Sequence, residues 1–234
     1  MAIFAIGDTH LSFDERIEKP MDVFGDRWEN HAERLRDNWE ALVGPDDTVL
    51  VCGDISWGLR LEEAMADLKW LDSLPGHKVI TKGNHDLWWT SISKLNRISP
   101  GLTFLHNTAY HSEREGVWIC GTRGWICPGT EGFDEHDDKI YKREVLRLDM
   151  SLAEARPAEG EALIAALHYP PCNDRFQASG FTETLEKYGV KTCVYGHLHG
   201  KEAFKNGYKG FRNGVEYKLV SLDFVGASPV RIHG

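Results

Sequence analysis

Short apolar runs alternate with amphipathic segments along the first part of the chain. Residues 2–6, 48–52 and 78–81 are rich in apolar and β-branched side chains, and a glycine lies one or two positions beyond each run. These features are typical of buried strands. Residues 28–43 and 61–74 instead space their apolar side chains three or four positions apart, which predicts helices with one buried face. The alternation favours an α/β fold.

The pattern changes after residue 101, where several strands are expected to follow one another before a charged segment at 123–138. A helix and further strands are expected beyond that segment. We therefore expect mixed sheets within a single domain, residues 1–234. The elements predicted for this half lie at residues 102–105, 108–112, 117–120, 141–152, 163–167, 181–188, 191–195 and 215–220.

Asp, Asn or His follow five of the predicted strands. In open α/β sheets, ligands bind at the carboxyl ends of the strands, and glycine there allows a sharp turn close to a bound group. We therefore expect these side chains to converge on one site. The five strand ends are Gly7-Asp8-Thr9-His10, Gly53-Asp54, Gly83-Asn84-His85-Asp86, His168-Tyr169-Pro170-Pro171 and Gly196-His197-Leu198-His199-Gly200.

The residue types in these segments favour metal binding. Imidazole, carboxylate and amide donors without a thiolate suit Mn, Fe, Zn or Co better than Ca. Seven donors are too many for one tetrahedral ion, and they suit two divalent ions, about 3.5–4 Å apart, that share a carboxylate. The candidate ligands are Asp8, His10, Asp54, Asn84, His168, His197 and His199.

Each segment alone also has a purely structural interpretation. Gly-Asn-His-Asp could form a turn, because Asn and Asp tolerate a left-handed backbone. A lone His168 could be an ordinary core histidine. Asp86 could either orient His85 or cap a helix that is expected to begin near Trp89. The conjunction of five such segments, each behind an apolar strand, favours a metal site over coincidence.

In this order the five segments resemble the calcineurin-like metallophosphoesterase superfamily, whose pattern is D-x-H, GD, GNH[DE], a lone H and GHxH. They span residues 7–200. The resemblance implies a four-layer αββα sandwich, in which two mixed β-sheets are flanked by helices. It also implies a metal-dependent phosphoric ester hydrolase, in which two cations activate a water molecule for attack on phosphorus.

The resemblance also implies roles for individual residues. Asp54 would bridge the two ions, while His85 would be a catalytic residue that faces the substrate phosphate and binds no metal. One ion would be held by Asp8, His10, Asp54 and His199. The other would be held by Asp54, Asn84, His168 and His197.

Comparison with the branches of the family reduces the number of candidate substrate classes. The second motif continues as Ile-Ser-Trp-Gly at residues 55–58, without the Asp and Arg that phosphoprotein phosphatases carry there. Their absence argues against a phosphoserine or phosphothreonine phosphatase. Residues 167–171, Leu-His-Tyr-Pro-Pro, are similar to prokaryotic phosphohydrolases and phosphodiesterases, and residues 121–125 are similar to a little-characterised prokaryotic branch.

The net charge and the cysteine content indicate which binding partners and which cellular compartment to expect. The net charge of −9 argues against non-specific binding to nucleic acid, which needs clustered Lys and Arg. The five cysteines form no CxxC pair, which indicates reduced thiols in the cytoplasm. The N-terminus lacks the basic region of a signal peptide, and no apolar stretch approaches the length of a membrane helix.

The favoured function is a dinuclear metal-dependent phosphoesterase that acts on a phosphomonoester or phosphodiester, with a small anionic or nucleotide-like substrate preferred over phosphoprotein. Two alternatives remain. A catalytically silent interaction scaffold would lack ligands or the motif histidine, and here all are present. A nuclease would carry a basic flank or a further domain, and neither is visible in the sequence.

Three further features concern the substrate. Arg123 lies in a glycine-flanked turn and is either a phosphate contact or a partner in a surface ion pair, while Lys139 and Arg143 are expected to face solvent. Segment 123–138 is either a mobile lid or a long surface loop. Segment 200–214 has a charge of +3 and three aromatic residues, and it is either a solvated hairpin or a surface that binds the substrate.

Overall fold

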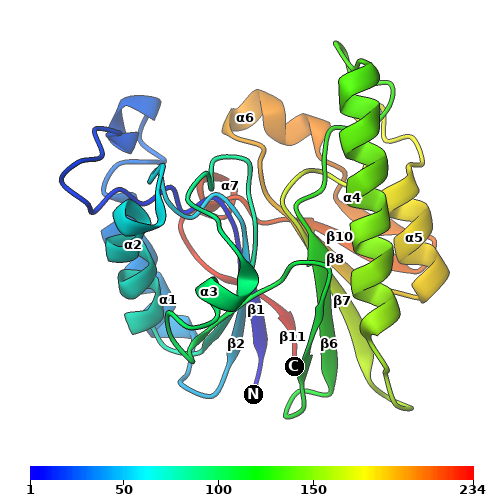
Figure 1. The fold of residues 1–234 in the computed structure, drawn as a ribbon, viewed down its shortest axis with the longest axis horizontal. Coiled ribbons are helices and arrows are strands. Elements are labelled where there is room, and N and C mark those ends of the chain that lie inside the picture. The colour runs from blue at the N-terminus through cyan, green and yellow to red at the C-terminus, as the bar shows by residue number, and fades with distance from the viewer.

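Two mixed β-sheets pack face to face, and helices cover the outer face of each (Figure 1). The computed structural model describes residues 1–234. Helices α1 (His31–Leu42) and α2 (Leu61–Ser73) cover one sheet, and α4 (Glu135–Glu154) and α5 (Gly180–Tyr188) cover the other. The arrangement confirms the predicted αββα sandwich.

The first sheet has the strand order β11-β1-β2-β3-β4. Strands β1 to β4 are parallel, and β11 (Val230–His233) is antiparallel to β1 at the edge. Both termini therefore lie at the same end of the sheet (Figure 1). The parallel strands are β1 (Ile3–Ile6), β2 (Thr48–Cys52), β3 (His77–Thr81) and β4 (Leu102–Phe104).

The second sheet has the strand order β5-β6-β7-β8-β10-β9. Its four inner strands are parallel, and the two edge strands are antiparallel to their neighbours. The strands are β5 (Ala109–Ser112), β6 (Val117–Thr122), β7 (Ala162–Leu167), β8 (Thr192–Tyr195), β10 (Val215–Leu219) and β9 (Gly210–Arg212).

Three apolar clusters fill the spaces between the four layers. Alternate side chains of a strand point to opposite faces. Phe4 and Ile6 of β1 therefore pack under α1 and α2, while Ile3 and Ala5 face the second sheet. On the far side, Leu148 of α4 packs against the second sheet. Strands that are buried on both faces need apolar residues at every position, which explains the continuous apolar runs in the sequence.

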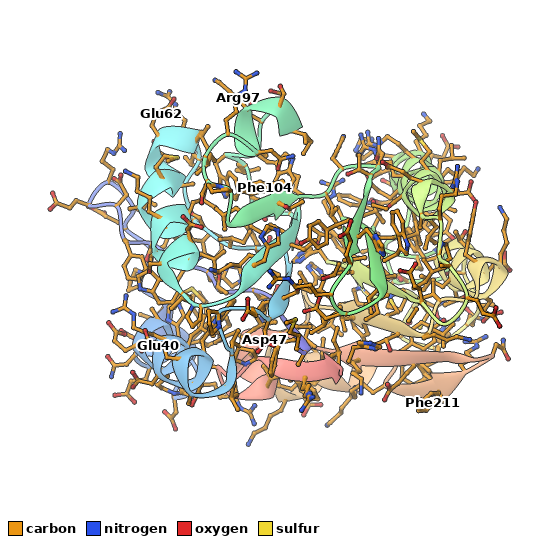
Figure 2. The ribbon with its side chains drawn as sticks, turned by 90° about the horizontal axis from the view of Figure 1, so that it is seen from below. Glu40, Asp47, Glu62, Arg97, Phe104 and Phe211 are labelled. Atoms are coloured by element: carbon orange, nitrogen blue, oxygen red, sulfur yellow. The ribbon has the colours of Figure 1, made fainter.

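The helix expected near Trp89 is only the single turn α3 (Ile92–Leu95). The indole rings of Trp88 and Trp89 pack edge-on against Phe104 of β4, which lies next to α3 (Figure 2). This packing holds residues 88 and 89 in a turn, so the helix begins later than its apolar pattern indicates.

Helix α4 begins inside the segment that was expected to be a loop. The side chain of Asp134 accepts hydrogen bonds from the backbone N–H groups of His136 and Asp137, and it thereby caps the helix at Glu135. The loop is therefore shorter than the predicted segment 123–138.

Segment 200–214 is a hairpin only in its last part. It starts with α6 (Gly200–Ala203) and a 3-10 turn, η2 (Phe204–Asn206), before β9 pairs with β10. Phe204 is buried, but Phe211 is 73% exposed on the edge strand (Figure 2). The aromatic residues of segment 200–214 are thus not all packed on the sheet.

None of the helices combines the length and the apolar character that a membrane span requires.

Candidate metal centre

The ends of five parallel strands bring the seven candidate ligands to one place. Both sheets contribute, because their strands run toward the same edge of the sandwich (Figure 1). The first sheet supplies the residues after β1, β2 and β3, which are Asp8, His10, Asp54 and Asn84. The second sheet supplies the residues after β7 and β8, which are His168, His197 and His199.

Four of these residues have a left-handed backbone, which residues with a Cβ atom rarely adopt. Such strain persists where the surrounding structure fixes it, and it is concentrated at functional sites. Two glycines make room for the carboxylates: a Cβ on Gly83 would clash with the side chain of Asp54, and one on Gly196 would clash with that of Asp8. The left-handed residues are Asp8 (φ 59°), His10 (φ 43°), Asp54 (φ 51°) and His197 (φ 73°).

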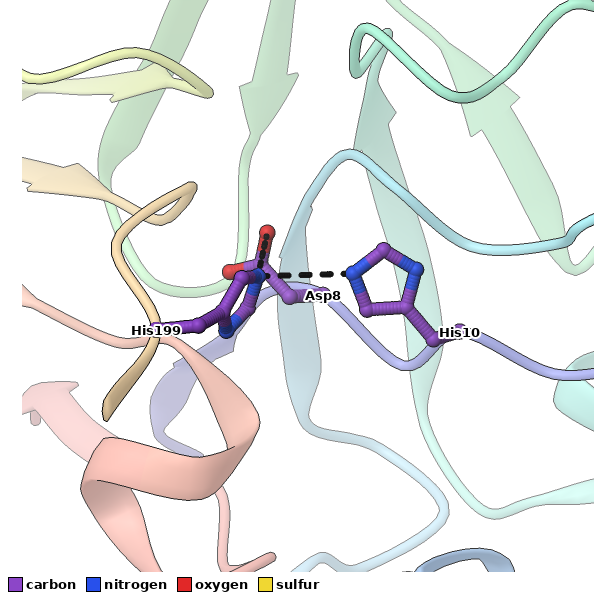
Figure 3. A group of neighbouring side chains, drawn as sticks. All are labelled: Asp8, His10 and His199. Atoms are coloured by element: carbon purple, nitrogen blue, oxygen red, sulfur yellow. Dashed lines mark hydrogen bonds and ion pairs between the residues drawn. The ribbon is translucent and has the colours of Figure 1, made fainter. Parts of the chain in front are cut away.

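A first group of ligand atoms comes from Asp8, His10 and His199. The two imidazole rings point toward each other, with the Asp8 carboxylate beside them (Figure 3). The Nε2 atoms of His10 and His199 are 3.4 Å apart, and His199 Nε2 lies 3.6 Å from Asp8 Oδ1. The three ligand atoms all lie within 4.8 Å of one another, so a single ion could contact all of them.

A second group surrounds His168. Its Nε2 atom lies 3.4 Å from Asp54 Oδ2 and 2.7 Å from Asn84 Oδ1. His197 joins this group, since its Nδ1 atom lies 2.9 Å from Asn84 Oδ1 and 3.2 Å from His168 Nε2. The amide oxygen of Asn84 thus faces two imidazole nitrogens.

The hydrogen bonds of His168 fit a cation in the second group. Its Nδ1 atom donates to the carbonyl oxygen of Cys52 at 2.9 Å, and in the neutral ring this leaves the lone pair on Nε2. The nearest atom to that lone pair is the Asn84 amide oxygen, which is also an acceptor. Two acceptors at 2.7 Å repel each other unless a cation attracts both. The donor set therefore fits a metal ion.

Asp223 orients His199, although no sequence motif marks it. Its Oδ1 atom accepts from His199 Nδ1 at 2.9 Å, and its Oδ2 atom accepts from the Gly200 N–H at 2.9 Å. A carboxylate behind a ligating imidazole fixes the tautomer and raises the basicity of the ligand. Asp223 lies in α7 (Leu222–Val225), just beyond β10, but no glycine marks that strand end.

Burial sets the protonation of the metal-free centre. It raises the pKa of Asp54 to about 7 and lowers the pKa of His197 to about 3. Burial also lowers the pKa of His199, but hydrogen bonds to Asp223 and Asp8 outweigh it and raise that pKa to about 10. A metal ion that binds here therefore displaces protons from Asp54 and His199.

His85 lies at the mouth of the centre. Its side chain is exposed, with a ring centroid 4.5 Å from that of Trp57 and 5.8 Å from that of His10. Its backbone N–H donates to Asp54 Oδ1 at 2.7 Å. Partial desolvation and the neighbouring His168 lower the pKa of His85, which favours its neutral imidazole. The ring can contact a group that is bound at the centre.

Asp86 has neither of its predicted roles. It accepts hydrogen bonds from the backbone N–H groups of Gly83, Asp54 and Ile55 at 2.7–2.9 Å, and from the Trp88 indole at 3.0 Å. No hydrogen bond links it to the His85 ring, and no helix starts beside it. A buried carboxylate that gathers three backbone donors ties the turn after β2 to the turn after β3.

A cleft of about 540 Å³ opens beside the first group. His10, His85 and His199 line it on the side of the metal centre, and Trp28 and Trp57 supply aromatic surface. The Trp57 indole stacks on the His10 ring with centroids 4.7 Å apart. The 3-10 turn η1 (Met21–Phe24) lines another part of the cleft. A small molecule in this cleft would contact both the aromatic surface and the metal centre.

Arg123 lies outside this cleft, and the structure does not bring it among the ligands. Its guanidinium group stacks on Trp125 at 4.5 Å and lies 3.7 Å from a carboxylate oxygen of Glu144. The backbone carbonyl of Arg123 accepts hydrogen bonds from the N–H groups of His168 and Tyr169. Its side chain therefore belongs to a neighbouring pocket.

Comparisons with solved structures show the same fold in proteins of low sequence identity. The phosphopantetheinyl hydrolase PptH from Mycobacterium tuberculosis is 16% identical, with a TM-score of 0.57 over 99% of this chain and 95% of that one. The protein AQ665 from Aquifex aeolicus, of unknown function, is 14% identical, with a TM-score of 0.53 over 98% and 95%. At these identities the similarity shows the fold alone.

Sequence comparisons identify the family. The Gene 66 protein of Mycobacterium phage L5 is 43% identical over 79 residues, which are 34% of this chain and 37% of the phage protein. The matched region therefore spans little more than a third of that relative. The family model described as calcineurin-like phosphoesterase matches residues 1–201. The chain therefore belongs to the calcineurin-like phosphoesterase family.

Proposed function

We propose that this chain uses two divalent transition-metal ions, such as Mn, Fe or Zn, to hydrolyse a small anionic phosphomonoester or phosphodiester. The position of Asp54 Oδ2 carries the proposal. This atom lies 3.9 Å from His10 Nε2 and 3.4 Å from His168 Nε2. One oxygen thus faces a histidine from each group, as a carboxylate that bridges two ions does.

Asp8 is the other candidate for the bridge, because it belongs to both groups. Its contact with His168 is to Nδ1, at 3.7 Å, and the proton on that nitrogen is donated to Cys52. Its contact with His199 is to Nε2, at 3.6 Å. These contacts support Asp8 as a ligand of the first ion only, and Asp54 as the bridge.

Bound ions at such a centre supply the Lewis acid that activates water and neutralises the charge on phosphate. The chain's own residues would position the substrate. His85 would donate a hydrogen bond from its neutral ring to a phosphate or leaving-group oxygen. Trp28 and Trp57 would pack against the alcohol part of the ester in the cleft.

The volume of the cleft and the net charge of the chain support a small substrate. A cleft of about 540 Å³ is within the range of sites for small molecules, and the net charge of −9 opposes the approach of a nucleic-acid backbone. All five cysteines are buried and free, which supports a function in the reducing cytoplasm.

A substrate screen with a parallel metal analysis tests the proposal. Metal-reconstituted protein would be assayed with p-nitrophenyl phosphate, bis(p-nitrophenyl) phosphate and a series of nucleotides. We expect turnover of at least one compound, loss of turnover with EDTA, and recovery with Mn²⁺. Protein that retains two ions per chain yet turns over none of these compounds would contradict the proposed substrate class.

A further inference from the structure

A second pocket, of about 200 Å³, lies between the end of β3, the end of β6 and helix α4. It is separate from the cleft described above, and it is strongly basic. Four basic side chains and one carboxylate leave three positive charges around it, in a chain whose net charge is −9. We call it the basic pocket. Its charged residues are Lys82, Arg123, Arg143, Glu144 and Arg147.

Glu144 is the common partner of the three arginines. It is fully buried, and Arg147, Arg143 and Arg123 approach its Oε1 atom at 2.7, 3.3 and 3.7 Å. Its Oε2 atom accepts a hydrogen bond from Thr122 at 2.7 Å. One carboxylate neutralises only one of three guanidinium charges, so this cluster attracts a further anion.

Two of the cations have donors without a partner. The Nε atom of Arg123 is buried and forms no hydrogen bond. Lys82, which also lines the basic pocket, forms neither an ion pair nor a side-chain hydrogen bond, whereas the three arginines all pair with Glu144. Leaving a buried donor unpaired costs free energy. An oxyanion in the pocket would satisfy these donors.

The basic pocket adjoins the metal centre. Lys82 lies two residues before Asn84 on the same turn, and the backbone carbonyl of Arg123 accepts from the N–H of His168 at 3.1 Å. A continuous series of side-chain contacts also joins the two sites. Arg123 packs on Trp125, Trp125 packs on Tyr169, and the Tyr169 ring centroid lies 4.1 Å from that of His197. A substrate whose scissile phosphate lies at the metal centre could therefore place another group in the pocket.

We propose that the basic pocket binds a second phosphate group of the substrate, so that the preferred substrate is a phosphoester that carries a further phosphate. The planar forks of three arginines suit the oxygens of a phosphate. This inference rests on the function proposed above, because it assigns a specificity to the same centre.

A matched pair of substrates tests the inference. Thymidine 5′-(p-nitrophenyl phosphate) would be compared with the same compound carrying a 3′-phosphate, and kcat/KM would be measured for each by release of p-nitrophenol. We expect the wild-type chain to prefer the second compound. Arg147→Gln should reduce this preference about tenfold or more, which corresponds to the loss of a hydrogen bond between charged groups, and mainly through KM. Lys142→Gln is the control, because Lys142 is exposed on the same helix and pairs with Asp138 outside the pocket.

Glu144→Gln should change the preference in the opposite direction. It keeps the size of the side chain but removes the carboxylate that competes with the phosphate for the arginines, so the preference for the doubly phosphorylated compound should rise. If the cluster is only a structural ion-pair network, both variants would lower the melting temperature and leave the preference unchanged, and that result would overturn the inference. If Glu144→Gln does not fold, Arg147→Gln alone decides.

A binding measurement separates this inference from the proposed function. If the chain hydrolyses neither compound, titration of the metal-loaded protein with inorganic phosphate by calorimetry still reports on the pocket. Weaker binding to Arg147→Gln than to Lys142→Gln would support the pocket although the proposed function had failed. Equal binding to the two variants would overturn the pocket.

Discussion

The ring of His199 is held from behind by Asp223, whose Oδ1 atom accepts from Nδ1 at 2.9 Å. The Nε2 atom of the same ring faces His10 and Asp8. Since the second carboxylate oxygen accepts from the Gly200 N–H, Asp223 fixes both the ring and the start of the segment that follows it.

Asp223→Asn should therefore weaken metal binding although Asp223 contacts no ion. An amide cannot accept both hydrogen bonds, so the His199 ring loses its fixed tautomer and orientation. We expect the affinity for the first ion to fall about 10- to 100-fold, as measured by calorimetric titration of Mn²⁺. Asp37→Asn removes the same charge from the exposed face of α1 and serves as the control. Unchanged affinity in Asp223→Asn would rule out the positioning role.

Asp54→Ala should lower the occupancy of both ions, because only a bridging ligand touches both. His197→Ala should mainly affect the second ion, since the His197 ring contacts Asn84 and His168 of that group. Elemental analysis of gently purified variants measures both effects. If Asp54→Ala lost one ion and kept the other fully occupied, the bridge would have to be assigned to Asp8.

His85→Asn should keep both ions and lose about 10²- to 10⁴-fold in kcat, the usual contribution of a group that transfers or shares a proton in the transition state. The loss should be largest for substrates with poor leaving groups. His136→Asn, a substitution at an exposed site on α4, is the matched control. Full activity of His85→Asn on such a substrate, with unchanged metal content, would show that the ring has no part in the chemistry.

Asp67 of α2 is a buried carboxylate outside the group of candidate ligands. Burial raises the pKa of Asp67 from 3.8 to about 6, although its carboxylate accepts hydrogen bonds from Ser56 and from the backbone of Phe13. Because the folded state prefers the protonated acid, Asp67 favours folding most below pH 4, and this contribution is lost as the pH rises through 6.

Asp67→Asn should therefore stabilise the chain at pH 7 relative to the wild type, by at most about 3 kcal/mol, and the advantage should disappear near pH 4. Thermal unfolding in EDTA at both pH values measures the difference without a contribution from bound metal. Glu62→Gln, at an exposed position of the same helix, should show no such pH dependence. A stabilisation that is equal at both pH values would contradict the assigned cause.

The sequence was sufficient to predict the four-layer fold and the convergence of seven candidate ligands at one edge of it. A buried strand shows itself as a continuous apolar run, and a polar residue directly after it, beside a glycine, is at a sheet edge where ligands bind. Asp8, Asp54 and His168 all carry this signal. The αββα arrangement followed from the family pattern, and the two mixed sheets confirm it.

Other residues of the site had no such local signal. Asp223 follows β10 without a glycine, and its partner His199 is far from it in sequence. Glu144 stands next to Arg143, which was expected to face solvent and is exposed. Contacts with Thr122 and Arg123 of a distant strand end bury Glu144, and no local pattern records them.

The division of the candidate ligands between two sheets would give bound ions a mechanical role. Asp54 and Asn84 come from one layer, and His168 and His197 come from the other, so an ion at this edge would join the layers as a reversible cross-link in a chain whose cysteines are all free. The stabilisation that such a cross-link provides depends on the concentration of free metal. In a chelating buffer the two layers are held at this edge by packing and by hydrogen bonds such as that from His168 Nδ1 to the carbonyl oxygen of Cys52, and the cleft lies beside that seam.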